Sequence, residues 1–239
     1  MFLNMKVFLL EVLTRMYIEL EDVDGRLEDM LIEISERNEI SCFELPVYIQ
    51  EGNNNYIDPE EVDAHNFSRI IRATPSDLEN RDFFFDRKNS EYAIGISSKV
   101  KINGFREAHL RHLDIDYLPN PSEAPELFEE SIKRLFSFLY ERERRMRIDQ
   151  SLLFPVYQKR TNLGFLVNSG NGLHYHALVT VGEKRWKDWI RKARKRSEIE
   201  DNWCDIQLKR GFSILRMTSS SIKKNSPRLS YRVRARPNS

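Results

Sequence analysis

The chain has 239 residues, of which 40% are hydrophobic and 31% charged, and its formal net charge is +1. These values are ordinary for a globular protein that buries a core, and no apolar run is long enough to span a bilayer, so we expect no membrane partner. Two distant cysteines, Cys42 and Cys204, cannot build a cysteine-based zinc site, and they argue against a disulfide framework. With no signal peptide recognisable at the N-terminus, they favour a cytoplasmic location.

Charge is distributed unevenly along the chain. Residues 1–63 hold sixteen acidic and four basic side chains, whereas residues 206–239 hold nine basic side chains and no acidic one. Such asymmetry is typical of proteins with a surface that faces nucleic acid, nucleotides or anionic lipid, although a charged chain can also segregate charge by accident.

The first third of the chain reads as helix followed by a polar loop. Apolar residues recur at helical spacing through residues 1–40, with a break at Asp24-Gly25, and residues 51–61 form the loop. We therefore divide the chain into an acidic, mainly helical segment over residues 1–60 and a core over residues 61–239 that ends in a basic segment.

Two strands and a long helix are predicted next. Residues 90–99 alternate in polarity, and so do residues 108–118. In the second strand one face carries Leu110, His112, Asp114 and Asp116, and the other face carries Leu113, Ile115 and Tyr117. PNPSEAP ends this strand and opens a helix with an apolar stripe made of Leu127, Ile132, Leu135, Phe136 and Leu139.

The remaining elements are mostly short. Strands are predicted at SLLFPVY (151–157), LGFLVN (163–168), LHYHALVTV (173–181), NWCDIQL (202–208) and FSILRM (212–217), with a basic helix around KRWKDWIRKARKR (184–196). The C-terminal RLSYRVRARPNS reads as an edge strand or a basic tail. This order predicts an α/β or α+β fold built around one mixed sheet.

Asp114 and Asp116 form the first candidate site. Alternate positions of a strand share a face, so the two carboxylates lie side by side and repel each other. A divalent cation such as Mg²⁺ or Mn²⁺ offsets that repulsion, because such cations prefer oxygen ligands. The alternative is a solvated strand end with two incidental acids.

The turn SGNGLH, residues 169–174, is the second candidate. Gly170 and Gly172 allow backbone N–H groups to approach an anion closely, while Ser169 and His174 add side-chain donors. The same letters also suit a simple hairpin turn, and a hairpin can itself hold a phosphate.

A third block follows near the C-terminus. Asp205 lies on a predicted strand, Arg216 on the next one, and Lys223 and Lys224 come after it. An acid can complete a metal site, and arginine and lysine bind phosphates.

The order of these blocks resembles the archaeo-eukaryotic primase (prim-pol) superfamily, in its plasmid and virus type. HLDID (112–116), VNSGNGLH (167–174), CD (204–205) and ILRMTSSSIKK (214–224) are similar to its successive motifs. Thr218-Ser219 stand where the family usually has Pro-Gly. The resemblance covers roughly residues 90–224 and implies an RRM-like sheet that carries the active site beside an N-terminal α/β unit.

The resemblance implies a template-directed primase-polymerase that transfers a nucleotide from NTP or dNTP to a 3′-hydroxyl. Asp114, Asp116 and Asp205 would hold divalent ions, with no zinc expected. The phosphates would be bound by Ser169, Gly170, Gly172, His174, Arg216, Lys223 and Lys224. Implied partners are a single-stranded DNA template and a helicase or accessory replication subunit, in a cytoplasmic, nucleoid-associated setting.

The basic helix is a candidate contact for nucleic acid, through Arg191, Lys192, Arg194 and Lys195. Its Trp186 and Trp189 either stack on bases or anchor the helix in the core, and helical periodicity favours the core.

Two other functions fit parts of the sequence. His174-Tyr175-His176 resembles the metal-binding pair of HUH endonucleases, for which Tyr231 is the one tyrosine further along the chain. A non-catalytic, primase-like subunit that binds nucleic acid is the second alternative.

Overall fold

The computed structural model describes residues 18–49, 69–84, 92–104, 106–120, 123–151, 161–170, 172–219 and 225–235. The predicted helix before residue 18, the predicted loop at 51–61 and most of the predicted strand at 151–157 lie outside these residues. So do Lys223 and Lys224.

A five-stranded antiparallel sheet forms the first half of the molecule. Its strands in spatial order are β1 (Ile18–Asp22), β11 (Arg228–Ala235), β8 (Thr161–Asn168), β9 (Leu173–Ala177) and β7 (His112–Ile115). Every pairing in it is antiparallel. The sheet therefore joins strands from the beginning, middle and end of the chain.

The second sheet has six strands. Its main path runs through β10 (Ile214–Arg216), β4 (Tyr92–Ser97), β2 (Ile40–Ile49), β5 (Lys99–Ile102) and β6 (Arg106–His109), and β3 (Arg69–Ala73) also pairs with β2. These pairings are antiparallel too.

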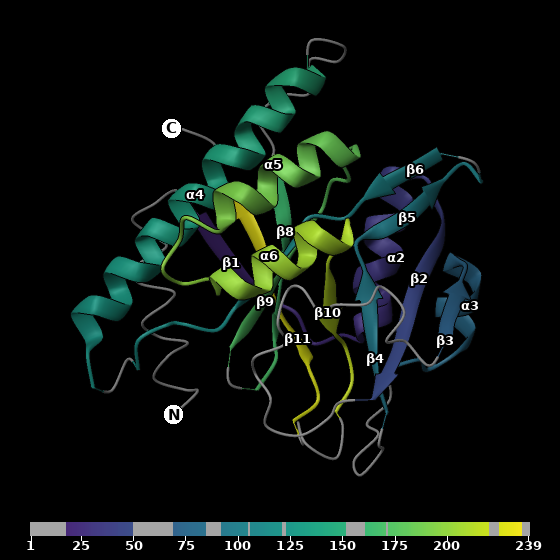
Figure 1. Ribbon diagram of the computed structural model, residues 1–239, viewed down its shortest axis with the longest axis horizontal. Helices are drawn as coiled ribbons and strands as arrows, with labels where there is room; N and C mark the ends of the chain where they lie inside the picture. The colour runs from purple at the N-terminus through teal and green to yellow at the C-terminus, as the bar shows by residue number, and fades with distance from the viewer. Residues whose placement is uncertain are drawn as a thin grey trace.

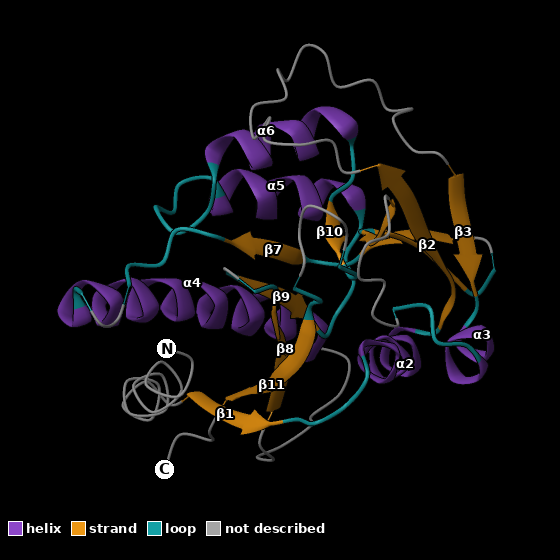
Figure 2. Cartoon of the chain, turned by 90° about the horizontal axis from the view of Figure 1, so that it is seen from below, coloured by secondary structure: helices purple, strands orange, loops and turns teal. Residues whose placement is uncertain are grey.

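Five helices are present in the described residues: α2 (Leu27–Asn38), α3 (Pro75–Asn80), α4 (Pro125–Ser151), α5 (Glu183–Ala193) and α6 (Asp201–Arg210). The long helix α4 runs along one face of the five-stranded sheet, while α5 and α6 lie beyond its β7 edge (Figure 2). On the other side of that sheet stand α2 and the second sheet (Figure 1).

Each face of the five-stranded sheet has its own core. Leu113, Ile115 and Tyr175 pack with apolar residues of α4 and α5. Phe165 and Val167 point to the opposite face, where they join a cluster that includes α2 and the second sheet. The alternation predicted for residues 112–115 is therefore confirmed, because it decides which side chains meet which core.

The α+β class is confirmed, with the strands divided between two antiparallel sheets rather than gathered in one mixed sheet. The predicted strand at 108–118 is divided into the end of β6 and all of β7. Leu127 was expected in the apolar stripe of the long helix but is 58% exposed, and its neighbour Phe128 is buried instead.

Two element predictions are wrong. Residues 18–22 form β1 rather than helix, because they pair with β11 far along the chain. NWCDIQL lies in helix α6, not in a strand; Gly211 ends this helix in the left-handed conformation, and its N–H donates to the Gln207 carbonyl. The C-terminal RLSYRVRA is a strand, β11.

The uneven charge is partly neutralised inside the molecule. Arg232 on β11 pairs with Glu33 on α2 and, at 3.3 Å, with Glu21 on β1, and Arg234 lies 2.6 Å from the same Glu21. Acids of the N-terminal segment thus meet arginines of the C-terminal one. These ion pairs within the molecule account for part of the uneven distribution of charge along the chain, and that part needs no polyanionic partner to explain it.

Within the described residues, none of the helices combines the length and the apolar character that a bilayer crossing requires.

Candidate active site

Antiparallel pairing of β7 with β9 gathers one acid and three histidines on a single face. Asp114 lies opposite His174, and His112 lies opposite His176. On the next strand, β8, Val167 lies opposite His174 and Phe165 lies opposite His176. These polar side chains therefore face the second sheet, away from α4.

Asp114 and His174 are in contact, with 3.4 Å between the carboxylate Oδ1 and the imidazole Nε2. Burial, and after it the positive charge of Arg216, lowers the pKa of His174 to about 3. The imidazole is therefore neutral at neutral pH, so the contact joins a carboxylate to an uncharged ring rather than forming an ion pair.

The other histidines of this face are also held neutral. Burial lowers the pKa of His176 to about 3 and that of His112 well below its usual range, with the neighbouring histidines as further causes. Their ring centroids lie 5.6 Å apart. Protonating either ring would place a positive charge in a buried site.

This burial predicts a pH-dependent stability. An unfolded histidine has a pKa near 6.5, so between about 6.5 and 3 the unfolded chain binds more protons than the folded one. The free energy of unfolding therefore falls as pH drops through that window. We expect His176→Gln to flatten the slope by roughly 1 kcal/mol per pH unit, measured by urea denaturation from pH 7 to 4.5.

Tyr175→Phe is the matched control for this experiment. It removes a buried hydroxyl that donates to the Leu163 carbonyl at 3.0 Å but titrates no group in this range. It should lower stability equally at each pH. An unchanged slope in His176→Gln would contradict the assignment of His176 as a buried neutral histidine.

The turn between β8 and β9 closes over the end of β7. The Ser169 N–H donates to the Gly172 carbonyl at 3.1 Å, and the Gly170 N–H donates to Oδ1 of Asn168 at 2.8 Å. A Cβ on Gly172 would meet the Ile115 carbonyl oxygen at 2.6 Å and Oδ1 of Asp116 at 2.7 Å. Glycine at 172 is therefore what lets the turn approach the Asp116 carboxylate.

Gly170 is required for a second reason. Its φ of 105° lies in the region that favours glycine, and a Cβ there would meet Asn225 at 2.7 Å. The turn is therefore packed between the end of β7 and the segment that leads into β11.

Arg216 reaches this turn from the second sheet. Its guanidinium donates to the Ser169 carbonyl at 2.9 Å, the Asn225 carbonyl at 2.9 Å and the Thr218 carbonyl at 2.6 Å. One side chain thus joins three segments of the chain. Arg216 therefore positions the turn as well as bringing positive charge to it.

The structure brings together most of the predicted site. Its members come from three separate blocks of sequence: Asp114, Asp116, Ser169, Gly170, Gly172, His174 and Arg216.

Asp205 differs from the prediction. It lies on α6, and its Oδ2 is 2.8 Å from Nη2 of Arg194. Among the described residues, no group of three or more histidine, cysteine or acidic side chains is arranged to hold a metal ion. The expected set of three carboxylates is therefore not assembled, because α6 directs Asp205 to Arg194, the residue that follows α5.

Two residues near Asp116 were not found by sequence reasoning. Burial raises the pKa of the Glu200 carboxyl, and the Asp116 carboxylate raises it further. Glu200 and then Asp116 also contribute to raising the pKa of Tyr117. These influences require the three side chains to lie near one another, and no local pattern links residue 200 to residue 116.

The basic helix α5 has a buried side and an exposed side. Trp186 and Trp189 are fully buried, so they are core anchors and do not stack on bases. Lys192 pairs with Asp188, and Arg194 with Asp205. Arg191 and Lys195 are exposed at the end of the helix, where contact with nucleic acid remains a prediction.

Comparisons of this chain with protein-family models, with curated proteins and with solved structures give no match.

Proposed function

We propose that this chain is a metal-dependent nucleotidyl transferase of the primase type, which adds a nucleotide from NTP or dNTP to a 3′-hydroxyl on a single-stranded template. One observation carries the proposal. Two acids at the end of β7, a glycine turn that abuts one of them and an arginine from the second sheet converge at one place. Simple folding does not require this combination of residue types.

The chemistry of the donor set fits Mg²⁺ or Mn²⁺. Asp114 and Asp116 would hold the ion, which polarises a phosphoryl oxygen when bound. Mg²⁺ in such enzymes is commonly bound by one or two carboxylates, with substrate phosphates and water completing its shell. Two protein carboxylates are therefore sufficient, and Asp205 need not take part.

The other residues act on the phosphates. Backbone N–H groups in a glycine turn and the charge of Arg216 favour an anion at this end of the sheet. His174 is neutral, so it serves as a hydrogen-bond donor or acceptor rather than as a cation. Asp114 lies against its Nε2 and helps to orient the ring.

An HUH endonuclease is less consistent with the arrangement. Tyr231 pairs in register with Leu166, and Leu166 with Tyr175, so Tyr231 shares the face of Tyr175. His174 and His176 flank Tyr175 on β9 and point to the opposite face. A tyrosine nucleophile on one side of the sheet cannot reach a metal held on the other.

Nucleotide incorporation tests the proposal. The protein is incubated with a primed and an unprimed single-stranded DNA, labelled NTPs or dNTPs, and Mg²⁺ or Mn²⁺. Metal-dependent extension or priming is expected, and EDTA should abolish it. If no product forms under any of these conditions while the DNA is bound, the non-catalytic alternative replaces the proposal. A covalent protein–DNA adduct without nucleotides would favour the HUH reading.

A replication role carries further expectations. The protein would act in the cytoplasm with the nucleoid, together with a helicase or accessory replication subunit. The exposed Arg191 and Lys195 at the end of α5 would contact the phosphates of the template backbone. Each such contact makes the affinity for DNA fall more steeply as the salt concentration rises.

A further inference from the structure

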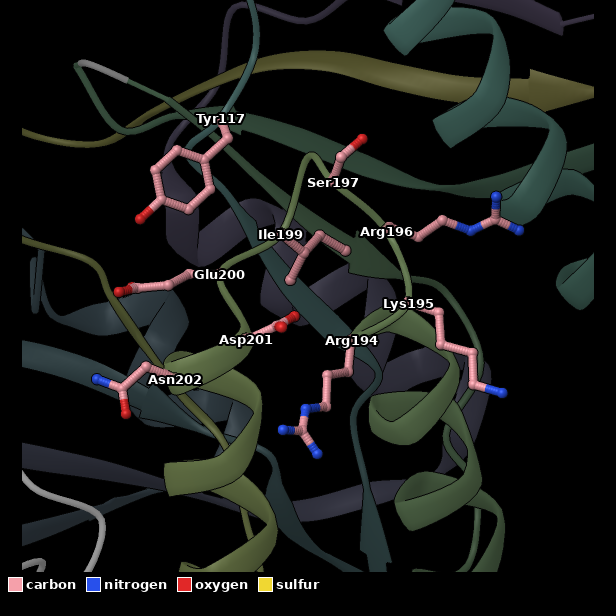
Figure 3. Close-up of a pocket in the computed structure, with 9 residues that line it drawn as sticks. All are labelled: Tyr117, Arg194, Lys195, Arg196, Ser197, Ile199, Glu200, Asp201 and Asn202. Carbon is pink, nitrogen blue, oxygen red and sulfur yellow. The ribbon is translucent and has the colours of Figure 1, made fainter.

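A pocket of about 550 Å³ lies between the end of β7 and the loop that joins α5 to α6. Figure 3 shows Tyr117 on one side of it, with Glu200, Asp201 and Asn202 on the other. Ile199 lies to the right of Glu200 in this view, nearer its centre. The volume is in the range of pockets that hold small organic ligands, on the order of 300–1,000 Å³.

The pocket adjoins the candidate active site. Tyr117 follows Asp116 directly in the chain, and its N–H donates to the Glu198 carbonyl at 3.3 Å, which fixes the loop against the strand end. Gly172 and the phosphate-binding turn lie against the Asp116 carboxylate. Asp116 is therefore flanked by the turn and by the pocket.

The lining suits a flat, hydrogen-bonding group. Tyr117 is 55% exposed, which leaves its aromatic side chain open for stacking. The Asn202 amide can donate and accept, and the carboxylates of Glu200 and Asp201 accept hydrogen bonds. Exocyclic amines and ring N–H groups of nucleobases are donors of the matching kind.

The cations around the pocket do not make it a phosphate site. Arg194 is paired with Asp205, and the guanidinium of Arg196 lies 4.8 Å from the ring centroid of Phe138 on α4. The charged ends of Lys195 and Arg196 point away from Tyr117 and Glu200 (Figure 3). The carboxylates of Glu200 and Asp201, which also line the pocket, would repel a phosphate.

We propose that this pocket holds the base and sugar of the incoming nucleotide, with the base stacked on Tyr117 and its phosphates directed past Asp116 to the turn at 169–172. This inference rests on the proposed function, because it places one nucleotide across both sites. Asn202 then contacts the polar edge of the base.

Binding measurements with two probes separate the two proposals. One probe is ATP and the other is inorganic tripolyphosphate, each with Mg²⁺, and calorimetry measures the binding of each probe. Tyr117→Ala should weaken ATP binding about tenfold, since stacking on an aromatic ring contributes on that scale, and should leave tripolyphosphate binding unchanged. Tyr117→Phe should bind ATP as the wild type does, because the ring is retained. Tyr92→Ala, at an exposed tyrosine of β4, is the matched control.

The outcomes are distinguishable. If Tyr117→Ala binds ATP like the wild type, the base pocket is overturned and the proposed function stands. If it weakens binding of an oligothymidylate but not of ATP, the pocket belongs to the template and the inference is equally overturned. A third outcome is that Tyr117→Ala weakens ATP binding, while the wild type does not bind tripolyphosphate and Asp114→Ala binds ATP as the wild type does. In that case the pocket stands and the proposed function falls. Should the wild type bind neither probe, both are wrong.

Discussion

Asp116→Asn should reduce nucleotide incorporation by roughly a thousandfold or more without lowering stability. The amide keeps the shape of the side chain but loses the negative charge, and metal stabilisation of a reacting phosphate amounts to several kcal/mol, which is about three orders of magnitude in rate. Asp114→Asn should behave similarly. Single-turnover incorporation with saturating Mg²⁺ or Mn²⁺ measures the effect.

Stability gives a second readout of the same variants. In the proposed site Asp114 and Asp116 share one ion, and without the ion the loss of one charge relieves the repulsion between them. Melting temperature without metal should therefore be unchanged or higher in Asp116→Asn. Mg²⁺ or Mn²⁺ should raise the melting temperature of the wild type and not that of the variant, because a ligand stabilises only the state that binds it.

Asp205→Asn is the informative control. Asp205 on α6 is paired with Arg194, which follows α5, so its loss should change incorporation by less than about tenfold. A loss as large as that of Asp116→Asn would show that Asp205 acts as a metal ligand. In that case Asp205 would have to leave Arg194 in the catalytically active conformation.

Arg216→Ala should raise the KM for the nucleotide by about tenfold to a hundredfold. Its guanidinium holds the Ser169, Thr218 and Asn225 carbonyls together, so the turn at 169–172 loses its support as well as a positive charge. Hydrogen bonds made by a charged group contribute about 1.5–3 kcal/mol each where they are buried, and the free energy of unfolding should also fall. Steady-state kinetics and urea denaturation measure the two effects.

Arg216→Lys separates position from charge. Lysine keeps the charge but cannot donate in a planar fork to three carbonyls. If Arg216 mainly positions the turn, Arg216→Lys will resemble Arg216→Ala; if it acts only through charge, Arg216→Lys will resemble the wild type. Arg81→Ala, which removes an exposed arginine paired with Asp77, should leave the KM unchanged. An unaltered KM in Arg216→Ala would remove Arg216 from the site.

Local patterns predicted the elements whose side chains meet a core along one face. The alternation of residues 112–115 and the helical periodicity of α4 and α5 follow from the geometry of a single strand or helix, and burial then selects the apolar face. β1 could not be found in this way. Its pairing with β11 is a long-range contact, and residues 18–22 taken alone also fit a helical stripe.

The mistaken strand at NWCDIQL has a different cause. Trp203 and Leu208 pack against the cores, but Cys204 and Gln207 are the buried residues of α6. The positions of the apolar residues alone therefore indicated the two-residue period of a strand instead of the period of a helix. The Lys-Arg-Gly ending at residues 209–211 was the available signal, because basic residues followed by glycine are typical of a helix C-terminus.

The sequence by itself determined which residue types the candidate site contains: two acids two apart on a strand, a glycine turn before a histidine, and an arginine further on. Their spacing follows from the period of a strand and from the steric freedom of glycine. Tertiary structure decided which of them meet. Pairing of β7 with β9 brought Asp114 to His174, the second sheet brought Arg216 to the turn, and α6 took Asp205 to Arg194. It also placed Glu200 near Asp116 and Tyr117, since contacts between distant segments depend on how the layers pack and leave no mark on local sequence.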